Sequence, residues 1–283
     1  TINEYNLCFN SFSEWAQQAI AAVFSYVRML LGTANPKDSL RCDCALYRFR
    51  QFVKYEMRPI VSKYIYTNLV LPNPEEAFDW VCQPYPILQY PSTYVARFMD
   101  MQPENFICEV EKGEFDCPSK CTCYKRDNIN QTIFVDCANR SLHEMPRFGT
   151  SLLPKGYNLD VSVAGNYITR FPECGANGYK WISVVTALNV NNNRAGGGHT
   201  NNSTLEQFLH CLTNVKKLYL DGTGLQHLPP TSMQTLTRNL TELEVPNDSL
   251  ICDCNSYWLK GWLQKFNRTV KDYQFIYCGD KGK

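Results

Sequence analysis

One pattern of apolar and polar positions recurs between Val161 and Leu250. It reads apolar, any residue, apolar, two residues, polar, any residue, apolar, in the segments VSVAGNYI, LNVNNNRA, LYLDGTGL and LEVPNDSL. The segments begin at Val161, Leu188, Leu218 and Leu243, which are 27, 30 and 25 residues apart. Because alternate side chains of a strand share one face, the pattern predicts short strands with their apolar side chains inward.

The polar position of each segment is expected in the turn that follows the strand. It is occupied by Asn166, Asn193, Thr223 and Asp248, and an asparagine there can both donate to and accept from neighbouring backbone groups. A unit this short cannot bury its own apolar face, so successive units must stack. This is the leucine-rich-repeat pattern, and it predicts an α/β solenoid of short parallel strands with an irregular or helical convex side. The alternative is four unrelated strands that share a pattern by chance.

Residues 13–32 have the periodicity of an amphipathic helix. Trp15, Ile20, Val23, Phe24 and Val27 can share one helical face, which is compatible with the helical side of upstream repeats. The longest apolar run, residues 19–27, is too short to span a bilayer. The chain shows neither a signal peptide nor an anchor, and we expect it to be part of a longer protein.

Cysteine is the most informative residue type. The chain has 14 cysteines, including CxC pairs at residues 42/44, 121/123 and 252/254, and no CxxC pair. Its four histidines do not adjoin the CxC pairs. Zinc sites usually combine CxxC with further Cys or His ligands, so we expect disulfides, an oxidising compartment and no metal. The net charge of +1, from 28 basic and 27 acidic residues, gives no indication of a nucleic-acid partner.

Glycosylation acceptors point to the same compartment. The sequence N-x-S/T occurs at Asn130, Asn139, Asn201, Asn202, Asn239, Asn247 and Asn267. The loop over residues 191–204, NNNRAGGGHTNNST, lengthens one repeat and contains two of these acceptors. We therefore expect a glycosylated excursion there.

Catalytic motifs are absent from the sequence. No GxSxG or HExxH occurs, and GGGH at residues 196–199 lacks the ending of a phosphate loop. We expect no enzyme activity, no catalytic residue and no cofactor. A protein partner would meet the outward residues of the strands, and the candidates are Ser162, Asn189, Asn191, Tyr219, Asp221 and Glu244. The alternative is a polar face that contacts only solvent.

A heptapeptide is nearly repeated, as DSLRCDC at residues 38–44 and DSLICDC at residues 248–254. A stack of repeats exposes an apolar layer at each end. Extracellular leucine-rich proteins close these ends with cysteine-rich caps, and the chain resembles them. The C-terminal cap begins with CxC and the N-terminal cap has the form C, CxC, C. The heptapeptide therefore marks two solenoid ends, with an N-terminal cap, CPSKCTCYKRDNINQTIFVDC, between them.

This order of caps and repeats resembles the membrane-proximal half of the ectodomain of invertebrate Toll receptors. The resemblance spans residues 38–278 and implies five regions. These are the end of an upstream solenoid (1–41), a C-terminal cap (42–112), an N-terminal cap (113–147), a solenoid of about four repeats (148–250) and a second C-terminal cap (251–283).

The resemblance also implies cysteine pairs, first with third and second with fourth in each cap. These pairs are Cys42–Cys82, Cys44–Cys108, Cys117–Cys123, Cys121–Cys137 and Cys252–Cys278. The partner of Cys254 would then lie beyond Lys283, and Cys8 has no assigned partner. Cys174 and Cys211 lie on the loop side of adjacent repeats, which favours a bridge between them over two buried thiols.

By the same resemblance, the chain is extracellular and belongs to a receptor for a cystine-knot cytokine of the Spätzle type. Such a receptor signals in innate immunity and development when two copies meet. The principal ligand contacts would lie on the upstream solenoid, and a downstream transmembrane helix would provide the membrane anchor. A secreted or adhesive scaffold of the Slit type is the alternative, and the sequence that follows the second cap would distinguish the two.

Overall fold

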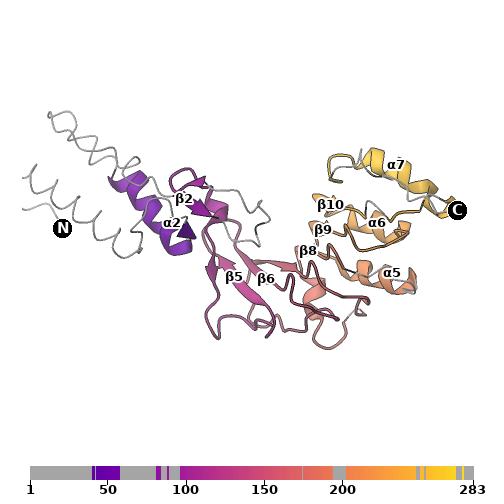
Figure 1. The fold of residues 1–283 in the computed structure, drawn as a ribbon, viewed down its shortest axis with the longest axis horizontal. Coiled ribbons are helices and arrows are strands. Elements are labelled where there is room, and N and C mark those ends of the chain that lie inside the picture. Colours follow the sequence, from indigo (N-terminus) through magenta and orange to yellow (C-terminus); the bar gives the residue numbers. More distant parts are fainter. Residues whose placement is uncertain are drawn as a thin grey trace, which may run out of the picture. The chain divides into compact units, whose positions relative to one another are not determined.

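The computed structural model describes residues 40–41, 43–57, 81–83, 88, 96–173, 175–193, 202–246, 249–251, 253–271 and 276. The amphipathic stretch expected at residues 13–32 lies outside these ranges. The chain divides into two compact units, Thr1–Cys108 and Glu109–Lys283. Each unit is described by itself (Figure 1).

The first unit contains a small sheet and a helix. Strand β1 (Leu40–Arg41) pairs in parallel with β2 (Val81–Gln83), and β2 pairs antiparallel with β3 (Ala96–Arg97). Helix α2 (Cys44–Gln51) continues into a π-helical segment, η1 (Phe52–Met57), and a short 3-10 helix, η3 (Pro103–Asn105), follows β3.

The aspartate of the CDC motif caps the start of α2. Asp43 Oδ1 accepts a hydrogen bond from Leu46 N at 3.0 Å, which satisfies one of the backbone donors that a helix start leaves free. Tyr47, on the same helix, packs against the buried ring of Phe106 with a centroid distance of 5.4 Å. Buried Arg50 donates from Nε and Nη2 to Met99 O. The helix is thereby tied to the residues that follow β3.

The second unit is built on a sheet with the strand order β10-β9-β8-β7-β6-β5-β4. The strands are β4 (Cys108–Glu109, at the boundary of the two units), β5 (Thr122–Arg126), β6 (Thr132–Asp136), β7 (Asn158–Ser162), β8 (Ala187–Asn189), β9 (Lys217–Tyr219) and β10 (Glu242–Glu244). From β6 to β10 every pair is parallel, whereas β5 and β6 form an antiparallel hairpin. The sheet is therefore mixed, because the predicted cap contributes a hairpin to the row of parallel strands.

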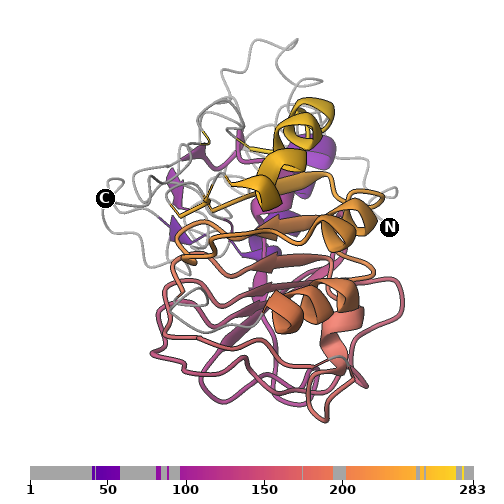
Figure 2. The ribbon, with the colours of Figure 1, turned by 90° about the vertical axis from the view of Figure 1, so that its right-hand side faces the viewer.

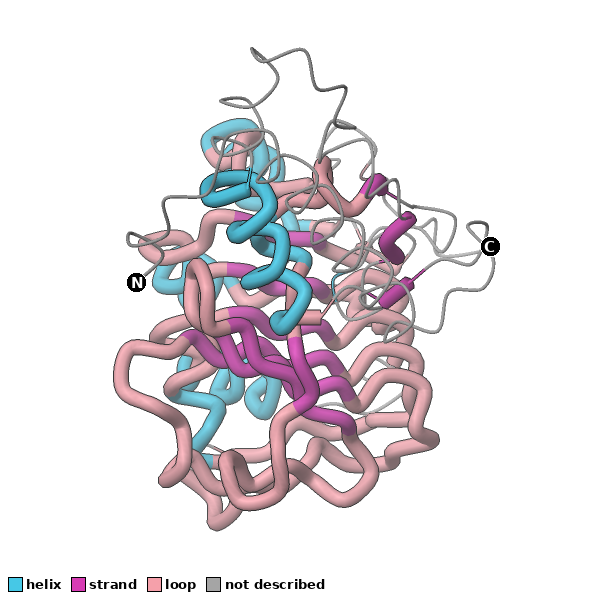
Figure 3. Tube along the Cα trace, turned by 90° about the vertical axis from the view of Figure 1, so that its left-hand side faces the viewer, coloured by secondary structure: helices cyan, strands magenta, loops and turns pink. Residues whose placement is uncertain are grey.

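Helices accompany the parallel strands on one side. These are the 3-10 helix η4 (Lys180–Ser183), α5 (Asn202–Cys211), α6 (Pro230–Leu236), the 3-10 helix η5 (Cys254–Ser256) and α7 (Tyr257–Lys265). In Figure 1, α5, α6 and α7 lie on the same side of β8–β10. Figures 2 and 3 view the sheet from opposite sides and show its strands one above another.

The apolar positions of the repeat pattern form the core between the sheet and these helices. Val161, Leu188, Leu218 and Leu243 are paired in register across β7–β10, and each is at most 2% exposed. They belong to a single buried cluster that extends from Phe115 to Val270. Burial of such side chains is the main favourable contribution to folding.

The polar position of the pattern forms an internal ladder of hydrogen bonds. Asn166 Oδ1 accepts from the backbone N atoms of Arg140 and Leu142, both at 2.9 Å, and its Nδ2 donates to Cys137 O at 2.9 Å. Asn193 repeats the arrangement one turn later, since its Oδ1 accepts from Ile168 N at 3.1 Å.

The last described member of the ladder is Thr223, whose hydroxyl donates to Leu220 O at 2.6 Å. The residue before each of the three members has a positive φ, at Gly165 (67°), Asn192 (55°) and Gly222 (63°). Left-handed backbone favours glycine and asparagine, so each turn has a residue type suited to its conformation. The four predicted strands are present, as are the turns after the first three, and Asp248 lies outside the described residues.

Candidate binding face of the parallel strands

The outward residues of β6–β10 form two rows that face away from the core. Strand register places Asp136, Ser162, Asn189, Tyr219 and Glu244 side by side in one row. The second row, two residues earlier in each strand, contains Phe134, Asp160, Ala187, Lys217 and Glu242. The candidates Ser162, Asn189, Tyr219 and Glu244 thus become neighbours through sheet pairing.

The other two candidates, Asn191 and Asp221, follow the strands and join the same cluster. Asn191 Nδ2 donates to Glu244 Oε2 at 2.7 Å, although the two residues are 53 positions apart. Asn191 Oδ1 accepts from Asp221 N at 2.8 Å, and Asn189 Oδ1 accepts from Asn191 N at 2.9 Å. The side-chain amide of Asn191 therefore connects three successive repeats.

Two candidates are more buried than the sequence analysis expected. Tyr219 is 6% exposed and Ser162 is 7% exposed, so neither presents an open side chain. The pattern of a single strand predicts the face of the sheet on which a side chain lies. It does not predict how far the side chains of adjacent strands cover that side chain. Burial, together with the nearby charge of Glu242, raises the pKa of the Tyr219 phenol, which keeps it neutral.

Charged residues of the second row were missed in the sequence analysis. Lys217 and Glu242 are register partners, and Lys217 Nζ lies 3.4 Å from Glu242 Oε2. Asp160 is in the same row, two strands from Lys217. The signal was available, because each of these residues precedes by one position the first apolar residue of its repeat. Extending the two-residue alternation one step back would have identified them.

Two carboxylates on this face, those of Asp160 and Asp136, have pKa values above the ordinary range. Burial raises the pKa of Asp160, and the hydrogen bond from Thr186 Oγ1 at 2.8 Å opposes the rise. Burial also raises the pKa of Asp136, against the hydrogen bond from Ala138 N at 3.0 Å. On the adjacent hairpin, the guanidinium of Arg126 lies 5.2 Å from the ring centroid of Phe134. The face therefore combines hydrogen-bonding groups and mixed charge over the buried ring of Phe134, and its polar character suits contact with a protein surface.

Disulfides hold the hairpin at one end of this face. Cys117 is bonded to Cys123 and Cys121 to Cys137, and the first unit contains Cys44–Cys108. These are three of the pairs that the cap resemblance implies. Cys82 and Cys211 are also disulfide-bonded, whereas Cys8, Cys42, Cys174, Cys252 and Cys278 lie outside the described residues. Within those residues, Cys254 is a free and exposed thiol.

Four of the glycosylation acceptors lie on exposed backbone. Asn130 is in the turn of the hairpin with φ 45°, and Asn139 follows the hairpin with φ 56°. Asn239 follows α6 and Asn267 follows α7, and both are exposed. Asn201 and Asn247 are not among the described residues, and nothing is described of the side chain of Asn202.

Comparison with known proteins places this geometry in context. No family model matches the chain. Protein toll of Drosophila melanogaster is 25% identical to it over 251 residues, which are 85% of this chain and 20% of that protein. The chain is similar to a region of Toll. It therefore spans about a fifth of the length of this curated relative.

A solved structure of the Toll–Spätzle complex, described as a molecular hub in Drosophila development and innate immunity, matches the fold. The TM-score is 0.55 at 21% identity, and the match covers 85% of this chain and 28% of that chain. The likeness and the disulfides together support a leucine-rich-repeat-type fold with cysteine-rich caps, in a region like part of the Toll ectodomain. No helix of the described residues has both the length and the apolar character to cross a membrane.

Proposed function

We propose that the chain is an extracellular region of a Toll-class transmembrane receptor, without enzyme activity of its own. In this proposal residues 148–250 form a short solenoid of about four repeats between an N-terminal cap at 113–147 and a C-terminal cap at 251–283. Residues 42–112 form the C-terminal cap of a preceding solenoid that ends at residue 41. The proposal is supported chiefly by the similarity to Toll over 85% of the chain.

The ligand in this proposal is a cystine-knot cytokine of the Spätzle type, which brings two receptor copies together for signalling in innate immunity and development. Because the matched region is 20% of Toll, we assign the principal ligand contacts to other parts of the receptor. The role of this region is to contact the second receptor copy. The proposed contact is the cluster of Asn189, Asn191, Asp221 and Glu244 around the covered side chain of Tyr219, since a polar, mixed-charge surface suits an interface that forms only on activation.

A receptor chimera tests the proposal. The matching region of Toll is replaced by this chain, and Spätzle-dependent reporter activity is measured in insect cells that display the chimera at their surface. We expect the reporter response to be retained. A chimera that reaches the surface and still binds Spätzle, yet gives no response, would contradict the proposed class.

Charge reversal on the face tests the assigned contact separately. Lys217→Glu changes the outward face, and Lys260→Glu on exposed α7 is the matched control. We expect Lys217→Glu to reduce the reporter response at unchanged surface expression, because it removes the ion pair with Glu242 and makes the row beside the proposed contact more acidic. Equal responses from the two variants would remove the face from the proposed interface.

A further inference from the structure

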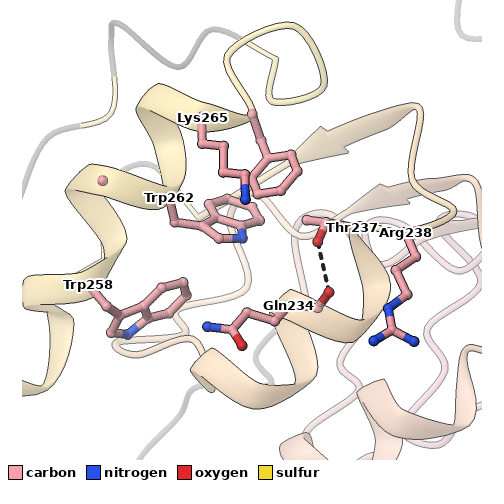
Figure 4. Close-up of a pocket in the computed structure, with 8 residues that line it drawn as sticks. Gln234, Thr237, Arg238, Trp258, Trp262 and Lys265 are labelled. Atoms are coloured by element: carbon pink, nitrogen blue, oxygen red, sulfur yellow. Dashed lines mark hydrogen bonds between the residues drawn. The ribbon is translucent and has the colours of Figure 1, made fainter.

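A groove of about 560 Å³ lies between α6 and α7, away from the proposed binding face (Figure 4). Trp258, Trp262 and Phe266 contribute aromatic rings to it. The two indoles meet edge to face at a centroid distance of 5.9 Å, and the Phe266 ring is 5.3 Å from that of Trp262. Gly261 lies between the tryptophans on the same helix, and a Cβ there would meet no atom within 4 Å. The groove therefore has an aromatic lining and open space above α7.

Among the residues that the structure describes, the indole Nε1 atoms of Trp258 and Trp262 have no hydrogen-bond partner, and Trp262 as a whole is 6% exposed. Both Nε1 atoms are buried, so the indoles present their rings and not their N–H groups to the groove. The donors that line the groove are the side chains of Arg238 and Lys265, and the described lining residues include no carboxylate. The groove thus offers hydrogen-bond donors beside aromatic faces, and its natural occupant is rich in acceptors and has an apolar face.

Two glycosylation acceptors adjoin the lining residues in sequence. Asn239 follows Arg238, and Asn267 follows Phe266. Asn239 Nδ2 donates to Thr213 O at 2.9 Å, towards the preceding repeat. Asn267 is exposed directly after the last aromatic ring of the groove. Of the two positions, Asn267 is the better placed to deliver a sugar to the groove.

We infer that the core N-acetylglucosamine residues of a glycan on Asn267 occupy this groove. In the linkage, a bond from Nδ2 to sugar C1 replaces one N–H, and the lipid diphosphate of the secretory pathway's donor leaves. The C–H face of the sugar packs on the rings of Trp258 and Phe266. The N-acetyl carbonyl and hydroxyl oxygens accept from the side chains of Arg238 and Lys265, which line the groove. The inference rests on glycosylation of the chain and not on the class of its receptor.

Enzymatic release of the glycans tests the inference. The chain is produced by secretion from insect cells, the occupancy of each acceptor is mapped by mass spectrometry, and release by a peptide:N-glycosidase is timed on the native protein. We expect the Asn267 glycan to be released about tenfold more slowly than the Asn239 glycan, which corresponds to about 1.4 kcal/mol of protection. After denaturation the two rates should agree.

Substitutions at Gly261 separate occupancy of the groove from a local structural effect. A Cβ at Gly261 meets no atom within 4 Å, so Gly261→Ala leaves most of the groove open, whereas Gly261→Leu adds a larger side chain to its lining. We expect the leucine variant to lose the protection of Asn267 and the alanine variant to keep it. We also expect the indole N–H resonances of Trp258 and Trp262 to shift in Asn267→Gln and not in Asn239→Gln.

Several results would overturn the inference. The first is an Asn267 that carries no glycan, and the second is an equal rate of glycan release from Asn267 and Asn239 in the native protein. The third is indole N–H resonances of Trp258 and Trp262 that do not shift when the Asn267 glycan is removed. If no acceptor is modified, the expectation from the sequence that the chain is glycosylated fails as well. If other acceptors carry sugar and only Asn267 does not, the receptor proposal is unaffected.

Discussion

Replacement of Asn166 by alanine should be among the most destabilising single changes in the second unit. Asn166 is 3% exposed, and its Oδ1 accepts from Arg140 N and Leu142 N. Alanine would leave both amides without this acceptor, at about 1–3 kcal/mol each. The carbonyls of Cys137 and Val163, which now accept from Nδ2, retain a second lone pair, so we count them as smaller losses. We expect Asn166→Ala to lower the free energy of unfolding by about 3 kcal/mol. This value is in the lower part of the range that the two amide losses allow, because water can enter the space left by the side chain.

Two further variants separate the contributions of individual hydrogen-bond donors and acceptors in the ladder. Thr223→Val is nearly isosteric and removes one hydrogen bond, from Oγ1 to Leu220 O, so we expect a cost of about 1 kcal/mol. Asn166→Asp keeps the acceptor for Arg140 and Leu142 but turns the donor into an oxygen that faces carbonyl groups. Its burial would raise the carboxyl pKa, and the cost should therefore shrink as the pH falls.

Urea unfolding of the oxidised protein measures these costs from the shift of the midpoint at unchanged m-value. Hydrogen exchange supplies the local readout, because the amides of Arg140 and Leu142 should lose more protection in Asn166→Ala than the amide of Leu218 on β9, which shares only the loss of global stability. The reasoning is refuted if Asn166→Ala costs no more than Thr223→Val. It is also refuted if those two amides stay protected, since the side chain would then not be their acceptor.

Three further predictions concern the fold and the binding face. Gly222→Ala should lower the free energy of unfolding in urea more than Gly175→Ala does. Both glycines have similar positive φ, but a Cβ at Gly222 would collide with Asn192, whereas one at Gly175 meets nothing within 4 Å. Equal losses would mean that backbone conformation alone causes the effect. Asp160→Asn should stabilise the protein at neutral pH and lose this advantage as the pH falls, because a raised carboxyl pKa disfavours the charged form in the fold; thermal unfolding from pH 7 to pH 3 measures it, and a gain that grows towards low pH would contradict it. Removal of the Cys121–Cys137 bridge, with a sequence separation of 16, should cost about 3 kcal/mol on the chain-entropy model. Removal of Cys117–Cys123, with a separation of 6, should cost about 2 kcal/mol. Urea unfolding of variants with both cysteines of a bridge replaced by alanine measures the order, and a reversed order would mean that native packing outweighs loop closure.

The sequence by itself determined the repeating elements of this protein. The alternation of apolar residues that predicted strands at Val161, Leu188, Leu218 and Leu243 is a local property, and each of these side chains is buried in the structure. The ladder position was predictable for the same reason, because Asn166 and Asn193 bond backbone within their own turn and the preceding one. The cap resemblance likewise required only cysteine spacing.

The tertiary structure decided which side chains meet between repeats. Asn191 reaches Glu244 across 53 residues, and Tyr219 is covered by its neighbours despite an outward position in the pattern. Both outcomes depend on strand register and on the size of adjacent side chains, which no single repeat encodes. The groove between α6 and α7 has the same origin. Its aromatic residues show a helical pattern in the sequence, but only the packing of two helices buries both indole N–H groups where no described residue accepts a hydrogen bond from them.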